Sequence, residues 1–327
     1  AKGVAFSLVM WRHHHHSDTS NLPFSYLIEN DDDTHIVPGV NLRSVGTIRD
    51  AQKWPKRDKR KDPEKLDQIN FNLLSPYTIQ KMYAGINILE TLKELSGETS
   101  ETYTYQSTII KHSSLFNGIK YYQMAINKFL GNSIIKRLEI TPFKSIDEIR
   151  NRLKPDTAIG TGSWVDLSGM IAPQSQIDQL LNDIDNNVLQ TLDDINRRFQ
   201  SIHANYYSYE WTWALQKIEE RLGKPYTEFT VQDIIDLALT WKKSVVDLDQ
   251  LLYEDAKKEF TLISKTGFGV DGDETTKQLD FINVRGQFEN NPFVKEVQQH
   301  IEKKSALCQE LIDRISPLLA WSRPYFK

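Results

Sequence analysis

The chain has 327 residues, of which 39% are hydrophobic and 26% charged, and its formal net charge is −4. The length suits about two domains of roughly 100–200 residues each, and the charge argues against a dedicated nucleic-acid binder or a membrane-surface protein. The single cysteine, Cys308, excludes an intrachain disulfide and a cysteine-rich zinc site, and it fits a reducing, cytoplasmic setting. No apolar run approaches the roughly 18 residues of a membrane span, and we find no secretory signal.

Residues 1–72 are predicted to be rich in β-structure. VAFSLVMW, FSYLIE and THIVPG contain many strand-forming residues, and the polar NDDD has the composition of a hairpin turn. NLRSVGTI is expected to be a further strand, whereas AQKWPKRDKRKDP is too polar and too closely bounded by prolines for a helix or a strand. Because the chain begins with alanine and enters a strand-like run at once, we interpret it as a piece of a longer protein with an N-terminal neighbour.

Residues 73–160 are predicted to mix helices and strands. Ser75 is a good N-cap, Pro76 suits a first helical position, and apolar side chains then recur at steps of three and four. YTYQSTII alternates like a strand, KHSSLFNGIKYYQMAINKFL is predicted to be helical, and IIKRLEI is ambiguous. Ser145 with Glu148 forms a capping box that predicts a short helix.

Residues 161–327 are predicted to form a bundle of long helices. Apolar side chains alternate steps of three and four from Leu192 to Trp213, from Val231 to Leu252 and from Val294 to Leu318, with one lysine in the last series. This spacing suits left-handed helix packing, and QSQIDQLLNDI adds a further helix. We therefore expect an α+β fold, predominantly α, in which a small N-terminal β-rich module precedes an antiparallel bundle of long helices.

Three other segments receive structural interpretations. AIGTGSWVDLSGMIAP is expected to be a loop, because it lacks the residue order of a phosphate-binding P-loop. GFGVDGDE lacks the spacing of a calcium loop and is predicted to be a turn between helices. NYYSYEWTW is interpreted as core or interface packing, with Tyr207 and Trp211 on a second face of its helix.

The run WRHHHHSD is the first candidate site. It lies between a strand-like segment and well-formed sequence, which argues against a purification tag. Neighbouring residues of an extended strand point to opposite faces, so only alternate histidines share a side. Two such pairs could bind a metal ion, His13 with His15 or His14 with His16. Asp18 could add a carboxylate ligand. A general base, an anion site and a polar loop stay open as alternatives, and the sequence specifies no cofactor.

The basic run KWPKRDKRK is the second candidate site. Its cations suit phosphate groups, and its indole can stack on a base or a sugar. The expected phosphate- or nucleotide-binding residues are Arg43, Arg49, Lys53, Trp54, Lys56, Arg57 and Arg60. The alternative is a solvated loop, or a patch that docks on the N-terminal neighbour.

Five strings together resemble one known family: HHHHSDTSNLPFSYL, VPGVNLRSVGTIRDAQKWPKRDKRKDP, LLSPYTIQKM, GSWVDLSGMIAP and NYYSYEWTW. The resemblance covers nearly the whole chain. It is to an uncharacterised family of long proteins from Bacteroidota and some spirochaetes. There, an N-terminal hexapeptide-repeat left-handed β-helix, similar to that of sugar acyltransferases and nucleotidyltransferases, precedes a mostly helical region of unknown function. The repeats are not in this sequence, and the family lends no catalytic residues to it.

The resemblance implies sugars or nucleotide sugars as ligands. We therefore expect this chain to be the accessory helical part of a cytoplasmic, hexapeptide-repeat transferase-like protein. Its expected partners are the β-helix domain, a nucleotide sugar or a second copy of the chain. We expect it to bind neither a membrane nor nucleic acid. In this hypothesis His14, His16 and Asp18 carry the catalytic chemistry, with one histidine as general base. A non-catalytic assembly module and a metal-dependent enzyme that uses the histidine run are the two alternatives.

Overall fold

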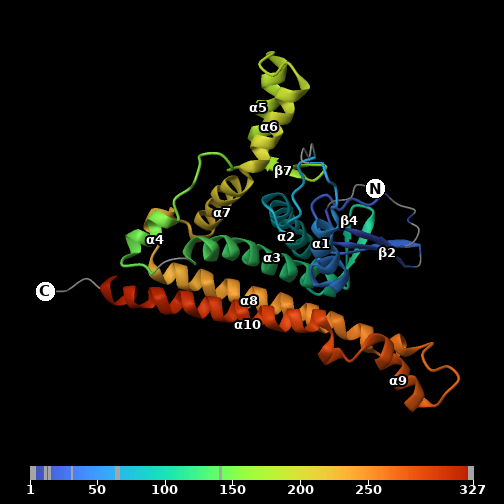
Figure 1. Ribbon diagram of the computed structural model, residues 1–327. Helices are drawn as coiled ribbons and strands as arrows, with labels where there is room; N and C mark the ends of the chain where they lie inside the picture. The colour runs from blue at the N-terminus through green and yellow to red at the C-terminus, as the bar shows by residue number, and fades with distance from the viewer. Residues whose placement is uncertain are drawn as a thin grey trace.

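The computed structural model describes residues 5–10, 13, 16–30, 32–62, 67–139 and 142–322. It contains a small mixed sheet, a separate two-stranded hairpin and a largely helical body (Figure 1). The predicted fold class, α+β and predominantly α, is therefore confirmed. Side chains from the sheet and from most of the helices join one continuous hydrophobic core.

The sheet has five strands in the order β1-β2-β3-β5-β4. They are Leu8–Met10 (β1), Tyr26–Asn30 (β2), Asp33–Val37 (β3), Thr102–Tyr105 (β4) and Thr108–Lys111 (β5). The predicted hairpin of β2 and β3 is confirmed, and YTYQSTII forms a second hairpin rather than one strand. β1 pairs in parallel with β2 and lies at one edge, while β3 pairs in parallel with β5.

The segment that follows β3 is helical, so the strand predicted for NLRSVGTI and the irregular structure predicted for AQKWPKR are both wrong. A 3-10 turn, Val40–Arg43 (η1), leads into Val45–Arg57 (α1). Val45 is buried against Ala256 and Val294, which belong to two later helices. Contacts made after the chain folds back thus outweigh the local preference of this segment, including the cost of Pro55 inside α1.

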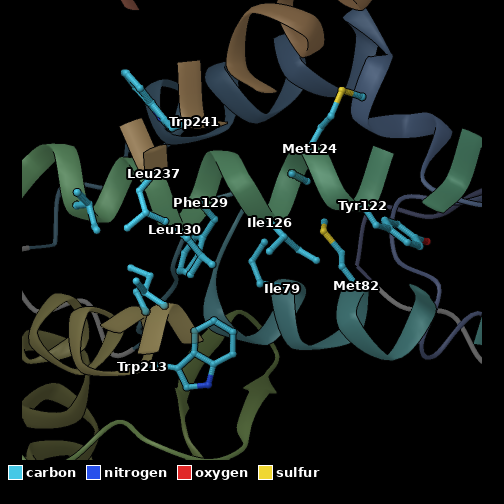
Figure 2. Close-up of a cluster of buried hydrophobic side chains, with 14 of the residues drawn as sticks. Ile79, Met82, Tyr122, Met124, Ile126, Phe129, Leu130, Trp213, Leu237 and Trp241 are labelled. Carbon is cyan, nitrogen blue, oxygen red and sulfur yellow. The ribbon is translucent and has the colours of Figure 1, made fainter. Parts of the chain in front are cut away.

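Helices Pro76–Ser96 (α2) and His112–Leu138 (α3) pack against each other at the centre of the molecule. Ser75 caps α2 as predicted, because its hydroxyl accepts the Thr78 amide at 3.2 Å. The ambiguous IIKRL extends α3 to Leu138. Buried side chains occur on most sides of α3, since α2, α7, α8 and the sheet pack against it (Figure 2).

The predicted loop AIGTGSWVDLSGMIAP contains a hairpin, and a projecting pair of helices follows it. The hairpin strands are Trp164–Leu167 (β6) and Met170–Pro173 (β7), preceded by the short helix Ile146–Arg152 (α4) that Ser145 caps as predicted. The paired helices Gln174–Asp185 (α5) and Leu192–Ala204 (α6) project from the body (Figure 1), and we name them the arm. The QSQIDQLLNDI helix thus lies outside the bundle. The predicted continuous helix through Trp213 is broken at Asn205, where Tyr206–Leu222 (α7) begins.

The other two predicted series form a long helical hairpin. Val231–Ala256 (α8) packs along Pro292–Ile315 (α10) and also against α3. The link between them contains a helix, Glu274–Arg285 (α9), and GFGVDGDE forms the turn before it, as predicted. The short 3-10 turns are Tyr226–Glu228 (η2), Lys257–Phe260 (η3), Ile263–Lys265 (η4), Phe288–Asn290 (η5) and Ser316–Ser322 (η6). Among the described residues, no helix has the length and apolar character needed to cross a bilayer.

Gly131 marks a close approach of α3 to α8. A Cβ there would lie 2.3 Å from the Trp241 Cβ, far inside van der Waals contact. We expect Gly131→Ala to lower the free energy of unfolding by about 1–3 kcal/mol, measured by denaturant titration. Gly46→Ala in α1 is the control, because its nearest neighbour would be the Ser44 Oγ at 3.6 Å. Equal stability of the two variants would contradict the tight contact.

Candidate functional site

A cavity of about 330 Å³ lies beside the C-terminal half of α3. Side chains of η1, α1, residues 72–74, α7 and α8 complete its lining, so it gathers residues that are far apart in the sequence. We name this cavity the α3 pocket. Its walls are largely apolar, and its polar side chains are Asn72, Lys128, Asn132, Ser133, Lys136 and Glu210. This volume and this mixture are typical of small-molecule sites.

Three of the polar residues form one stripe along α3. Lys128, Asn132 and Lys136 follow one another at steps of four, which places them on the same side of the helix. The Trp241 indole donates a hydrogen bond of 2.8 Å to the Asn132 Oδ1, and this contact holds the amide in place. The stripe therefore contributes two ammonium groups to the lining of the pocket.

Lys128 is partly buried, and burial lowers the pKa of its ammonium group. The negative charge of Asp249 opposes this effect, and the positive charge of Lys304 adds to it. Asp249 is itself buried on α8 and forms an ion pair with the His300 Nδ1 of α10. With the described residues Lys128 forms neither a hydrogen bond nor a direct ion pair, so an anion in the pocket has an ammonium group to bind.

Glu210 is the acidic residue of the pocket. The Tyr206 hydroxyl, one turn earlier on α7, donates a hydrogen bond of 2.6 Å to the Glu210 Oε2. Burial raises the pKa of Glu210 to about 7, although the Tyr206 hydrogen bond and the charge of Lys136 lower it. A carboxyl group that gains and loses a proton near neutral pH suits general acid or base chemistry.

A second cavity of about 350 Å³ continues from the α3 pocket. The two cavities share Ser133, Lys136 and Glu210. Arg137 lines the second cavity, where its guanidinium pairs with Asp156. Lys136 and Glu210 can therefore contact a ligand in either cavity.

Two family models match the chain. The model described as Domain of unknown function (DUF6819) matches residues 145–315, which is more than half of the chain. The chain belongs to the DUF6819 family. A second model, Domain of unknown function (DUF4954), matches residues 1–93. The sequence resemblance implied that the chain belongs to a region of unknown function, and the comparison confirms this part of the resemblance. Neither the curated proteins nor the solved structures contain a match.

The α3 pocket forms where the two matched regions meet. Leu42, Ile48 and residues 72–74 lie within the DUF4954 match, whereas Glu210 and Leu252 lie within the DUF6819 match. Helix α3 lies between the two matches and supplies both lysines. The pocket therefore requires both regions and the helix that connects them.

His13, the first residue of the histidine run, lies near the tip of the β2–β3 hairpin. The His13 Nδ1 is 3.3 Å from the Thr34 Oγ1 and 3.8 Å from the Glu29 Oε2. The His16 carbonyl accepts the Ser107 hydroxyl at 3.1 Å, so this part of the run is tied to the β4–β5 turn.

The remaining members of this predicted site are Asp18, His14 and His15. Asp18 Oδ1 accepts the Ser20 amide at 2.8 Å. His14 and His15 lie outside the described residues, and each predicted metal pair includes one of them, so metal binding and catalysis by this run stay predictions. Among the side chains that are described, no three of His, Cys, Asp or Glu come together as a metal site.

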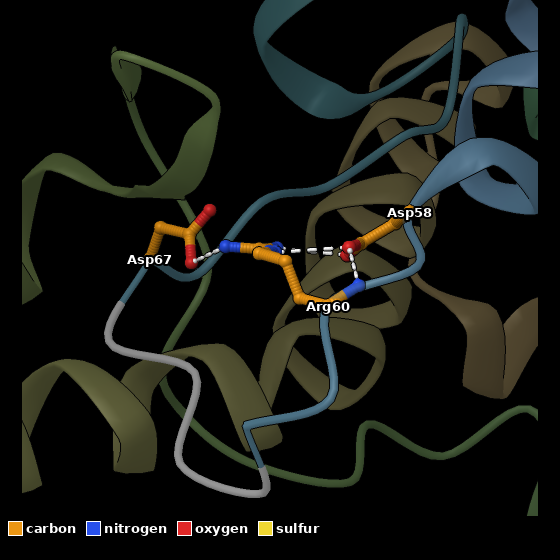
Figure 3. A network of polar contacts seen from close by, with 3 residues as sticks. All are labelled: Asp58, Arg60 and Asp67. Carbon is orange, nitrogen blue, oxygen red and sulfur yellow. Dashed lines mark hydrogen bonds and ion pairs between the residues drawn. The ribbon is translucent and has the colours of Figure 1, made fainter.

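The basic run occupies the end of α1 and the loop after it. Arg43, before α1, donates a hydrogen bond of 3.1 Å to the Tyr121 hydroxyl. Arg60 binds both Asp58 and Asp67 (Figure 3), and hydrogen bonds to these carboxylates raise its pKa further. Of the other predicted residues, Lys53 is half-buried, and those exposed are Arg49, Trp54, Lys56 and Arg57. Their predicted contacts with phosphate stay untested.

His13 and the start of the segment that leads to the basic run lie at opposite ends of the β2–β3 hairpin. His13 contacts the pair Glu29 and Thr34 near the hairpin tip, whereas η1 and α1 follow Val37 at the other end. Several residues of strand, at about 3.3 Å each, separate these ends. Among the described residues, no hydrogen bond or ion pair joins His13 to the basic run.

Sequence patterns alone did not single out Lys128, Lys136 or Glu210. The signal that could have found the lysines is a polar stripe at four-residue steps beside the apolar residues of α3. Glu210 is the one acid within NYYSYEWTW. Each pattern also suits a solvated helix face, and only the fold brings the three residues to one cavity.

Glu210 should make the stability of the protein depend on pH. Its pKa is about 7 in the folded chain against an ordinary value of 4.5, so between these values the folded chain binds more protons than the unfolded one. The free energy of unfolding then falls as pH rises through this window, by about 3 kcal/mol at most. Glu210→Gln should remove this loss, and denaturant titrations across the window measure it. A difference between wild type and variant that stays constant with pH would contradict the raised pKa.

Proposed function

We propose that the α3 pocket binds a phosphorylated sugar or a nucleotide sugar, and that this chain is the accessory helical part of a transferase-like protein. The observation that carries the proposal is one cavity of about 330 Å³ in which Lys128 and Lys136 accompany Glu210 between apolar walls. Cations favour a phosphate, and the carboxyl group favours a ligand that carries hydroxyl groups.

The lysine stripe matches the charge of a phosphate. An ammonium group binds phosphate as a point charge, and its attraction increases when water is displaced from around it. Asn72, Asn132 and Ser133 offer amide and hydroxyl groups to sugar hydroxyls, while Leu73 and Phe129 offer apolar surface to the ring. Arg137 is a poorer anion ligand, because Asp156 already neutralises it.

Glu210 supplies the acid or base of the proposed site. Below about pH 7 it is largely protonated and can donate a hydrogen bond to a ligand oxygen. Above this pH its carboxylate can accept a proton from a hydroxyl group. Tyr206 keeps the carboxyl in place through its hydrogen bond.

The proposal includes the hexapeptide-repeat β-helix as an N-terminal part of the same protein, in the cytoplasm, as the resemblance to the Bacteroidota and spirochaete family implies. Strand β1 supports such a neighbour, because it lies at the edge of the sheet. Its Leu8 and Val9 are 42% and 56% exposed. An open strand edge with apolar side chains favours contact with a further β element.

Calorimetric titration with a hexose 1-phosphate and with a UDP-hexose tests the site. The wild-type chain should bind at least one of the two ligands. Lys128→Met and Lys136→Met should each weaken binding at least about tenfold, because each removes a charge-assisted contact. Lys120→Met is the matched control, since Lys120 is an exposed lysine of α3 that does not line the pocket.

The same titration has a pH dependence of defined sign. Affinity should fall as pH rises above about 7, because ionised Glu210 repels the phosphate. Glu210→Gln should remove this part of the pH dependence. The proposed function would be rejected if neither ligand binds, or if the three lysine variants have equal affinities.

A further inference from the structure

The end of α1 borders an apolar hollow that the α3 pocket does not include. Trp54, Ile69 and Phe71 line this depression of about 270 Å³, and the Trp54 side chain is 63% exposed. The hollow is also lined by charged residues, Arg57, Asp58, Arg60 and Asp67, of which the last three form the network in Figure 3. Two cations and two carboxylates balance there, so the hollow suits an apolar side chain better than a phosphate.

Exposed lysines are next in sequence to the residues that line the hollow. Lys56, Lys59 and Lys61 are exposed and have no ion pair with a described residue, in contrast to Arg60. The run from Lys53 to Lys61 has six cations and one acid, although the whole chain has a net charge of −4. The remainder of the chain is therefore acidic, and this patch differs from it in sign.

The tip of the arm has the complementary properties. The arm projects from the body (Figure 1), and Val188 and Leu192 near its tip are 64% and 72% exposed. Asp185 and Asp193 lie beside them in the sequence and are exposed.

The charges of the arm differ in whether they are already neutralised. Asp183 is paired with Arg198, and Asp194 with Arg197. Asp185 and Asp193 have no ion pair in the described part of the chain. The arm tip thus offers aliphatic side chains flanked by two carboxylates that are not neutralised.

We propose that two copies of this chain associate reciprocally, with the arm tip of each copy docked on the Trp54 hollow of the other. Leu192 and Val188 enter the hollow, and Asp185 and Asp193 lie opposite Lys56 and Lys59. An apolar centre within a charged rim is the usual anatomy of a protein interface. A reciprocal contact also closes the assembly at two chains.

A second copy fits the patch better than an anionic membrane or a nucleic acid does. Such polyanions attract the basic run but repel the acidic remainder of the chain. The arm provides an aliphatic group and carboxylates together, which match both the apolar hollow and the basic run beside it. None of these residues lines the α3 pocket, so the dimer does not depend on the proposed function.

Light scattering coupled to gel filtration gives the first test. The wild-type chain should have the mass of two copies at high concentration. Leu192→Ser should raise the dissociation constant at least about tenfold, because it removes the apolar group from the interface. Leu95→Ser is the control, since Leu95 is 79% exposed in α2 and belongs neither to the hollow nor to the arm. A wild-type chain that stays monomeric, or equal masses for the two variants, would overturn the proposal.

A charge exchange gives the second test. The double variant Asp185→Lys/Asp193→Lys reverses the charge of the arm tip. The double variant Lys56→Glu/Lys59→Glu reverses the charge beside the hollow. Each double variant alone should be monomeric, whereas their mixture should form a heterodimer in which both contacts are restored. This recovery also excludes misfolding as the cause of the monomers. A mixture that stays monomeric would overturn the proposal. A wild-type chain that is monomeric and binds phosphatidylserine vesicles through Lys56 and Lys59 would also overturn it.

Discussion

The contact between α3 and α8 at Gly131 and Trp241 is the constraint on which the rest of the structure depends. Without a side chain at Gly131, the two helices approach closely enough for the indole ring to enter the core. The same indole donates its hydrogen to Asn132. The contact thus places α8 against the stripe of α3 that lines the pocket.

Burial on most sides of α3 explains why the polar residues at the pocket matter. Most of the helix is covered by α2, α7, α8 and the sheet, and the cavity is a place where this covering is incomplete. The incomplete covering leaves Lys128 and Glu210 partly shielded from water. This shielding lowers the pKa of Lys128 and raises that of Glu210, which brings both toward the neutral range.

Local patterns predicted much of the fold, and failed where distant contacts decide. The hairpin at NDDD, the cap at Ser75 and the seams of α8 and α10 depend on neighbouring residues, and the structure contains all of them. NLRSVGTI was misassigned because its β-branched residues favour a strand, whereas burial of Val45 against Ala256 and Val294 favours a helix. Asn205 breaks a seam whose apolar spacing continues without interruption, so spacing alone could not reveal the break.

The candidate site was less accessible to sequence analysis than the fold. The conspicuous histidine and basic runs are each continuous in sequence, yet no hydrogen bond or ion pair among the described residues joins His13 to the basic run. The α3 pocket instead combines residues of six segments, η1, α1, residues 72–74, α3, α7 and α8, and no one segment has a motif. A shifted pKa such as that of Glu210 arises from burial, which depends on the whole fold.

The long α8–α10 hairpin takes part in the electrostatics of the pocket although α10 does not line it. The single lysine in the third apolar series, Lys304, lies with its ammonium group 5.7 Å from the centre of the Trp241 ring, a contact that lets a cation occupy a helix seam. Its charge lowers the pKa of Lys128, whereas Asp249 raises it. Asp249 is buried, and its pair with His300 compensates the carboxylate for the loss of water. Removal of His300 would leave that carboxylate buried with one partner fewer, so α10 helps to keep in place the negative charge that favours a protonated Lys128.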